Sequence, residues 1–207
     1  MTNILFIGNS FIARNNVPQL LVNLAADRGH EVRFDLIQAG GASLRMHWNK
    51  GGAIKAIATG KYDWVVLQEQ STLPVKNADR MRENIELFVE PVALSGAKLA
   101  LYLTWARRNA PESQKAITNA YKSIGKQFGA TVVPTGVAWE TFLGKHERPV
   151  LHDKDLSHPT LAGSYLAACV FLATLFKESA TGIETELKGV SAAERLALQK
   201  TACALRR

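Results

Sequence analysis

The sequence Ile-Leu-Phe-Ile-Gly-Asn-Ser at residues 4–10 is the segment that most clearly indicates the fold class, because it joins an apolar run directly to a turn. A short run of consecutive apolar residues is typical of a strand that is buried on both faces of a parallel sheet. Glycine, asparagine and serine then favour a turn at the end of that strand. Further along, Pro18 and the spacing of Leu20, Leu21 and Leu24 predict a helix. The chain therefore begins as a strand, a loop and a helix.

The same alternation of strand and helix continues along the chain. Further strands are predicted at residues 31–37, 64–67, 98–103 and 131–133. Helices are predicted from Pro18 to a stop at Gly29, at residues 44–58 and 77–94, from Pro111 to Gly129, at residues 137–143, from Pro159 through the apolar run 161–176, and at residues 192–205. We therefore expect an α/β protein, a three-layer α/β/α sandwich of about five parallel strands with right-handed crossovers.

The composition indicates a folded protein without a nucleic-acid or membrane partner. Hydrophobic residues make up 47% of the 207 residues and charged residues 21%, and this length fits one domain over residues 1–207. The net charge of +7 is spread along the chain without a basic run, so we expect no nucleic-acid binding. No apolar run reaches membrane-spanning length, and residues 4–7 are too few for a signal peptide. We expect a cytoplasmic location, with export left open if a leader was removed.

Metal ligation is not expected from the cysteines and histidines. Cys169 and Cys203 have no Cys-x-x-Cys spacing, so both are predicted to be free thiols that are at least partly buried. His30, His146 and His152 lack metal-ligand spacing to carboxylates or cysteines, and we expect them at the surface. The sequence thus predicts no metal site.

Polar clusters follow the predicted strands at their carboxyl ends, where ligands bind in an open α/β sheet. These clusters lie at residues 8–10, 40–41, 68–72 and 105, and residues 155–159 precede the large C-terminal helix. Acyl transfer needs a hydroxyl nucleophile, a base, a group that orients the base and donors for the oxyanion. Residues of all these kinds are present in the clusters. We therefore expect a hydrolytic site at this edge of the sheet.

Within these clusters, Ser10 is the predicted nucleophile and His158 its base. Asp155 lies three residues before His158, so a turn would bring its carboxylate to the imidazole. Asp153 is a rival for this orienting role, and Ser71 is a weaker second candidate for the nucleophile. No metal or organic cofactor is needed for this chemistry.

The oxyanion would be met by the backbone N–H groups of Ser10 and Gly41 and by a side-chain amide after the third strand. Gln70 is the first choice for that amide and Gln68 the second, although either glutamine could instead satisfy backbone groups at the strand end. Residues that follow the second and fourth strands are candidates to bind substrate. They are Arg45, His47, Trp48 and Trp105, each with core packing or ordinary surface as the alternative, and Gln68 after the third strand is a further candidate.

Residues 6–11, Phe-Ile-Gly-Asn-Ser-Phe, resemble the first block of the SGNH (GDSL-like) hydrolases, with Asn9 where Asp is commoner. Residues 155–159, Asp-Leu-Ser-His-Pro, resemble the last block of that family, and Gly41 matches the glycine of its second block. The resemblance implies a flavodoxin-like sandwich of five parallel strands, no cofactor, and ester hydrolysis through Ser10, His158 and Asp155.

The third block departs from the family pattern. The family usually has Gly-x-Asn-Asp, whose Asn donates to the oxyanion, whereas residues 67–71 here are Leu-Gln-Glu-Gln-Ser. This segment resembles a subgroup with Leu-Gln-x-x-Ser at the same place. Loss of one oxyanion donor costs about 3–4 kcal/mol of transition-state stabilisation, so the identity of the amide bears on how active the protein is.

The leading hypothesis is a serine esterase that acts on a small or carbohydrate-borne acyl ester through a covalent acyl-enzyme. A lipase or thioesterase with the same residues is one alternative. A non-catalytic glycan-binding relative with a weakened oxyanion hole is another. A nucleotide-binding module is disfavoured because neither Gly-x-Gly-x-x-Gly nor a P-loop pattern follows the first strand.

Overall fold

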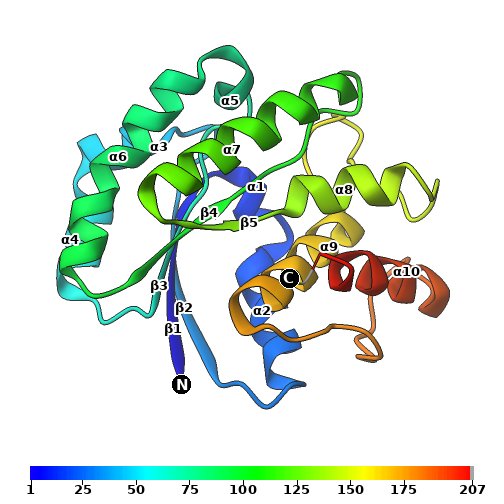
Figure 1. The fold of residues 1–207 in the computed structure, drawn as a ribbon. Coiled ribbons are helices and arrows are strands. Elements are labelled where there is room, and N and C mark those ends of the chain that lie inside the picture. The colour runs from blue at the N-terminus through cyan, green and yellow to red at the C-terminus, as the bar shows by residue number, and fades with distance from the viewer. Residues whose placement is uncertain (206–207) are drawn as a thin grey trace.

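The computed structural model describes residues 1–205 and contains a five-stranded parallel sheet (Figure 1). The strands are β1 (Thr2–Gly8), β2 (Val32–Gln38), β3 (Trp64–Leu67), β4 (Lys98–Tyr102) and β5 (Thr131–Val133), in the spatial order β2-β1-β3-β4-β5. All four neighbouring pairs are parallel. The predicted α/β sandwich with five parallel strands is confirmed.

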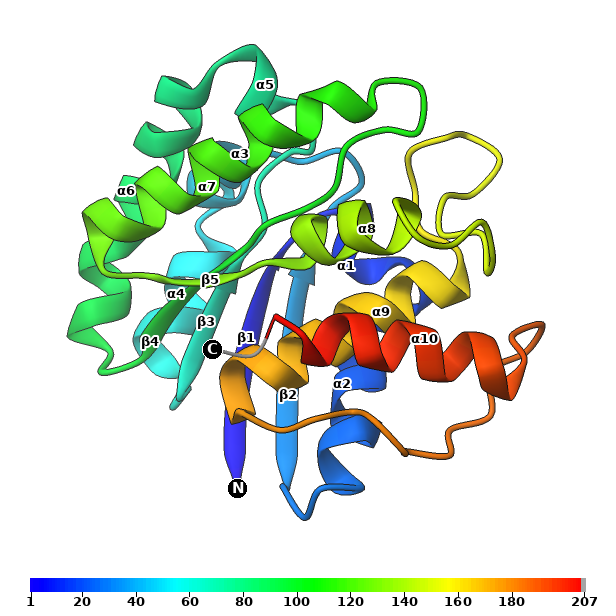
Figure 2. The same cartoon turned by 45° about the vertical axis from the view of Figure 1, so that its right-hand side comes forward.

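Helices cover both faces of the sheet, as Figure 2 shows from a second direction. One face packs against α2 (Val17–Ala26), α8 (Thr135–Leu143), α9 (Leu161–Phe171) and α10 (Ala192–Cys203). The other packs against α3 (Leu44–Lys50), α4 (Gly52–Thr59), α6 (Ala78–Leu94) and α7 (Gln114–Phe128). Because strand side chains alternate, β1 sends Ile4 and Phe6 into the first core and Leu5 and Ile7 into the second.

The order of the strands places the loops after β1, β2 and β3 side by side. β1 lies between β2 and β3, and the chain passes from one side of β1 to the other after β2. In register, Gly8 pairs with Gln38 and Ile7 with Leu67, so these three strands end at nearly the same level. We call the loops that follow β1, β2, β3 and β4 the rim. A ligand site is expected there because strand order reverses at β1.

Several element boundaries differ from the sequence expectation. A short helix, α1 (Ser10–Ala13), begins directly after β1, with the Asn9 side chain accepting the N–H of Phe11 as its N-cap. The expected helix over residues 44–58 is two helices, broken at Gly51, whose φ of 73° favours glycine. A further short helix, α5 (Leu73–Lys76), follows the glutamine cluster.

The entry to α9 also differs. Thr160 caps the helix by accepting the N–H of Gly163, and Pro159 lies outside it in an antiparallel bridge with His152. The apolar run continues past Phe171 as a π-helical turn, Leu172–Phe176. No helix within residues 1–205 has both the length and the apolar character needed to cross a membrane. Cys169 is buried, Cys203 is partly buried, and both are free thiols as expected.

Candidate active site

The structure brings Ser10, His158 and Asp155 together in one hydrogen-bonded chain. Ser10 is the first residue of α1, and its Oγ lies 2.8 Å from His158 Nε2. On the other side of the ring, His158 Nδ1 lies 2.5 Å from Asp155 Oδ2. A carboxylate only accepts, so Nδ1 carries the proton and donates it, which leaves the Nε2 lone pair facing the serine hydroxyl. This is the protonation state in which an imidazole can take a proton from Ser10.

Asp155 is held in place by its own turn. Its Oδ1 accepts the backbone N–H of Ser157 at 3.0 Å and of His158 at 2.9 Å. These donors, chiefly the N–H of His158, and the His158 side chain hold the pKa of Asp155 well below its usual range. Arg14 Nη1 adds a cation at 3.6 Å from Asp155 Oδ2. The carboxylate therefore stays ionised across the neutral range.

Asp153, the rival orienter, has a different partner. Its carboxylate pairs with Arg14 Nη2 at 3.1 Å, and its backbone N–H donates to the carbonyl of His158 at 2.8 Å. Its side chain therefore secures Arg14, while the imidazole is held by Asp155.

Three candidate oxyanion donors are not engaged by other protein groups within residues 1–205. These are the backbone N–H groups of Ser10 and Gly41 and the side-chain Nε2 of Gln70. Gly41 has a φ of 67°, which glycine adopts without strain. Gln70 Oε1 accepts from the N–H and the hydroxyl of Thr72 and from the N–H of Leu73, which fixes the amide and leaves its N–H₂ group to donate elsewhere.

Gln68 is buried and does not face substrate. Its side chain is fully enclosed, its Oε1 accepts the N–H of Asn9 at 2.9 Å, and its Nε2 donates to the carbonyl of Glu69. A Cβ on Gly8 would lie 2.6 Å from Gln68 Oε1, so glycine before the nucleophile loop is required for this contact. Gln68 therefore links the third rim loop to the first, and the expectation that it binds substrate is wrong.

Trp105 was expected to bind substrate, but the structure places it mainly in support of the base. It is 2% exposed, and its indole lies between the rings of Phe11 at 5.0 Å and Trp139 at 3.8 Å. Its Nε1 donates to the carbonyl of Ser157 at 3.0 Å, one residue before His158. Only its edge borders a cavity, because both faces of the indole are covered.

Arg45, His47 and Trp48 also serve the framework of α3. Arg45 Nε donates to Asn84 Oδ1 at 3.1 Å, and Trp48 packs edge-on against Phe88. The carbonyl of Gly8 lies 2.7 Å from His47 Nε2, which must carry the proton because a carbonyl only accepts. Burial lowers the pKa of His47, so its neutral form holds the strand end before Ser10. Substrate contact by Arg45 stays a prediction, because the bond to Asn84 engages only Nε of this half-buried side chain.

His152 and Glu69 are buried polar residues that sequence reasoning missed. His152 was expected at the surface, yet it is 4% exposed, and its Nε2 donates to the carbonyl of Ala106 at 2.9 Å. Glu69 is fully enclosed, and burial raises its pKa above the ordinary value. No periodic pattern indicated the burial of either residue, because both lie in irregular segments. Among residues 1–205, no group of three His, Cys, Asp or Glu side chains is arranged to hold a metal ion.

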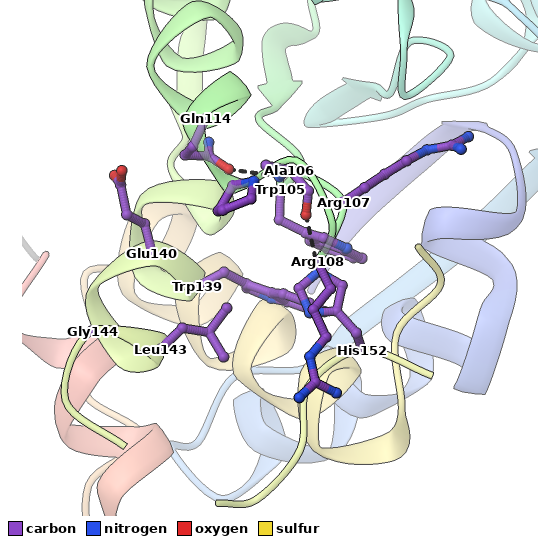
Figure 3. A pocket seen from close by; sticks show the side chains of 11 residues that line it. Trp105, Ala106, Arg107, Arg108, Gln114, Trp139, Glu140, Leu143, Gly144 and His152 are labelled. Atoms are coloured by element: carbon purple, nitrogen blue, oxygen red, sulfur yellow. Dashed lines mark hydrogen bonds between the residues drawn. The ribbon is translucent and has the colours of Figure 1, made fainter. Parts of the chain in front are cut away.

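Two of the cavities that adjoin the loop after β4 lie between it and neighbouring helices. The larger, about 390 Å³, lies between that loop, the start of α7 and α8, and Figure 3 shows Trp139, Leu143 and Arg108 around it. The smaller, about 260 Å³, is bordered by Ser71 and Thr72 of the third rim loop and by Arg107 of the fourth. The smaller cavity thus adjoins the segment that carries Gln70.

The fold is similar to solved SGNH hydrolases. A candidate SGNH hydrolase from Slackia heliotrinireducens is 26% identical, with a TM-score of 0.73 over 84% of this chain and 98% of that chain. A DUF4886 family protein from Bacteroides uniformis, at 22% identity, has a TM-score of 0.83 over 98% and 93%. The acetylxylan esterase Axe2 from Geobacillus stearothermophilus, at 18% identity, has a TM-score of 0.69 over 88% and 95%. No protein-family model and no curated protein matches the sequence.

Proposed function

We propose that this chain, whose fold is that of the SGNH hydrolases, is a serine esterase that cleaves a small or carbohydrate-borne acyl ester through a covalent acyl-enzyme. The observation that carries the proposal is the 2.8 Å contact between Ser10 Oγ and His158 Nε2, with Asp155 bound to the opposite ring nitrogen. A nucleophile within hydrogen-bonding reach of a base, itself oriented by a third group, is the arrangement that acyl transfer requires.

In the first half of the reaction, Ser10 Oγ attacks the ester carbonyl carbon while its proton passes to His158 Nε2. The carbonyl oxygen becomes an oxyanion, which the N–H groups of Ser10 and Gly41 and the Nε2 of Gln70 would stabilise. The intermediate then collapses, the bond to the alcohol oxygen breaks, and His158 returns the proton to that oxygen. Asp155 stabilises the imidazolium that exists between the two transfers.

In the second half, a water molecule attacks the acyl-enzyme. His158 Nε2 takes the proton of the water, a second oxyanion forms in the same place, and the bond between the acyl carbon and Ser10 Oγ breaks. The proton held by His158 passes to Ser10, which restores the free enzyme and releases the acid. Every proton in the cycle passes through one ring nitrogen, which explains why the tautomer fixed by Asp155 matters.

A short acyl group fits the smaller cavity better than a long chain does. Its volume of about 260 Å³ lies just below the range of ordinary ligand pockets. The similarity of the fold to an acetylxylan esterase supports a carbohydrate-borne acetyl group as the substrate. A lipid ester is the alternative, because a lipase/acylhydrolase from Enterococcus faecalis also has this fold, with a TM-score of 0.65. A panel of p-nitrophenyl esters of increasing chain length, with acetylated sugars beside them, separates the two.

The proposal is tested by p-nitrophenyl acetate hydrolysis with wild type, Ser10→Ala and His158→Ala. We expect kcat to fall by at least about 10³-fold in each variant, because each removes an atom that takes part in proton transfer. Ser71→Ala tests the rival hydroxyl: no base lies beside it among the contacts of residues 1–205, so kcat should stay within about threefold of wild type, and any effect of its place beside the smaller cavity should fall on KM. Wild-type kcat in Ser10→Ala would refute the proposal.

A further inference from the structure

We propose that Glu69 is a positioning residue that sets the spacing between the second and third rim loops and thereby aligns Gly41 and Gln70 on the oxyanion. This inference rests on the esterase function proposed above. Glu69 touches no reacting atom in this account and acts through the backbone groups it holds.

A single carboxylate oxygen joins the two loops. Glu69 Oε1 accepts the N–H of Leu44 at 3.0 Å and the N–H of Gln70 at 2.6 Å. Leu44 opens α3 directly after the loop that carries Gly41, and Gln70 carries the third predicted donor. Because both N–H groups meet at one oxygen, a shift of Glu69 would move both oxyanion donors relative to Ser10.

The second carboxylate oxygen fixes the orientation of the first. Glu69 Oε2 accepts Nδ2 of Asn84 on α6 at 2.8 Å. Asn84 Oδ1 in turn accepts Nε of Arg45 on α3 at 3.1 Å. The carboxylate is therefore held from two helices and supports two loops.

A carboxylate is the group that this position requires. Three donors converge on the side chain, and a carboxylate can accept all of them, whereas an amide would present its own N–H₂ to one. Removing a carboxylate from water is unfavourable, so a buried acid is expected only where its acceptors are needed. Arg45 from α3 offsets part of this cost as a nearby cation, and the hydroxyl of Tyr121 on α7 is the other titratable group close by.

The first test is Glu69→Gln, measured by steady-state hydrolysis of p-nitrophenyl acetate. We expect kcat to fall by at least about tenfold, short of the 10²–10³ that removal of a whole oxyanion donor costs, with KM changed by less than about twofold. Oxyanion alignment acts in the transition state, so the loss should appear in kcat. Unchanged kcat in a folded Glu69→Gln protein would overturn the inference.

The second test is rescue by the double substitution Glu69→Gln/Asn84→Asp. The new amide can donate to the new carboxylate while its oxygen accepts from Leu44 and Gln70, and Arg45 keeps an acceptor at position 84. We expect kcat to recover to within about threefold of wild type. A double variant as slow as Glu69→Gln would count against the arrangement.

Gln199→Leu is the matched control for lost buried hydrogen bonds. Gln199 lies on α10, is 1% exposed, and bonds to Tyr165, Gly182 and Ile183. It should lower the melting temperature without lowering kcat, and a kcat loss equal to that of Glu69→Gln would mean that the Glu69 effect is only structural. If Glu69→Gln does not fold, Asn84→Ala takes its place: reduced kcat at constant KM supports the inference, and unchanged kcat overturns it.

Ser10→Ala in the same assay separates this inference from the proposed function. Loss of turnover in Ser10→Ala together with wild-type kcat in Glu69→Gln would remove the role of Glu69 and leave the esterase in place. Full turnover in Ser10→Ala would remove the esterase mechanism itself.

Discussion

Asn9 joins the nucleophile loop to the second rim loop. Its Oδ1 accepts the N–H of Phe11, as an N-cap aspartate could, but its Nδ2 donates to the carbonyl of Ala42 at 3.0 Å. An aspartate at this position would place a carboxylate oxygen against the Ala42 carbonyl oxygen, and both oxygens only accept. The amide thus gives a physical reason for asparagine where the related block commonly has aspartate, and this contact ties the residue before Ser10 to the residue after Gly41.

Asn9→Asp should therefore destabilise the fold although it preserves the cap. We expect the free energy of unfolding, measured by urea denaturation, to fall by about 1–3 kcal/mol. Asn77→Asp is the matched control, because Asn77 caps α6 through Oδ1 at an exposed site and aspartate caps equally well there. Equal effects of the two substitutions would contradict the role given to Asn9 Nδ2.

Asp155 should make stability depend on pH. Its pKa is depressed in the folded protein, so its stabilising effect is complete above the ordinary aspartate pKa of about 4 and declines as pH falls from there through the depressed folded pKa. The melting temperature of Asp155→Asn should lie below that of wild type at pH 6, and the gap should narrow as pH falls below about 4. A gap that stays constant over this range would show that the carboxylate is not held in its ionised form.

The role of a single residue can be predicted from the sequence when its partner is close in sequence or belongs to the same ordered set of motifs. Asp155 and His158 are three residues apart, and the structure joins them as expected. Glu69 and His152 were missed because their partners, Leu44 and Ala106, lie far away in sequence. The Leu44 N–H and the Ala106 carbonyl need these side chains as partners only once folding has brought the loops together.

At the scale of elements, the loop after β4 supports the segment that carries the base. We call residues 151–160 the base loop. Three hydrogen bonds join it to the loop after β4. Trp105 Nε1 donates to the Ser157 carbonyl and the Arg108 N–H donates to the Leu156 carbonyl. In the other direction, His152 Nε2 donates to the Ala106 carbonyl. These contacts lie on both sides of Asp155 in sequence, so they restrict the position of the His158 imidazole relative to Ser10.

Trp105→Phe tests this support, because it keeps an aromatic ring between Phe11 and Trp139 but removes the donor. We expect kcat to fall about threefold to tenfold and the free energy of unfolding to fall by about 1 kcal/mol, since one buried hydrogen bond is lost. Trp48→Phe is the control, as Trp48 packs against Phe88 on the other face of the sheet. Wild-type kcat in Trp105→Phe would mean that the indole only fills space.

Elements with a clear apolar period were predicted well, whereas elements set by loop chemistry were not. β3 matches the predicted residues 64–67, and α6 differs by one residue from 77–94. The short helix α1 is too brief for a period to be seen, and it depends on the Asn9 cap. The break at Gly51 was hidden because the apolar pattern continues from α3 into α4.

At the scale of the whole molecule, α9 lies at the centre of the first core and positions both ends of the site. All but one of its residues are buried, and it packs against α2, α8 and α10. Its Ser164 hydroxyl donates to the carbonyl of Arg14 and accepts from Asn15, which ties the nucleophile segment to the helix that follows the base loop. Residues from the two ends of the chain therefore meet because one buried helix holds both.

Gly163→Ala should weaken this packing. An added Cβ would lie 2.5 Å from the Trp139 ring and 2.6 Å from the Leu151 carbonyl, so α8 and α9 must separate. We expect a loss of about 1–3 kcal/mol in the free energy of unfolding. Gly52→Ala, where a Cβ meets nothing within 4 Å, is the control. A neutral Gly163→Ala would contradict the close approach of the two helices.

The most direct measurement of the central claim is covalent labelling with a fluorophosphonate, followed by mass spectrometry of the digested protein. We expect one adduct, on the peptide that contains Ser10, and its loss in His158→Ala, because the base 2.8 Å from the hydroxyl makes that hydroxyl nucleophilic. Absence of an adduct on the wild-type protein, or an adduct at Ser71 in place of Ser10, would contradict it.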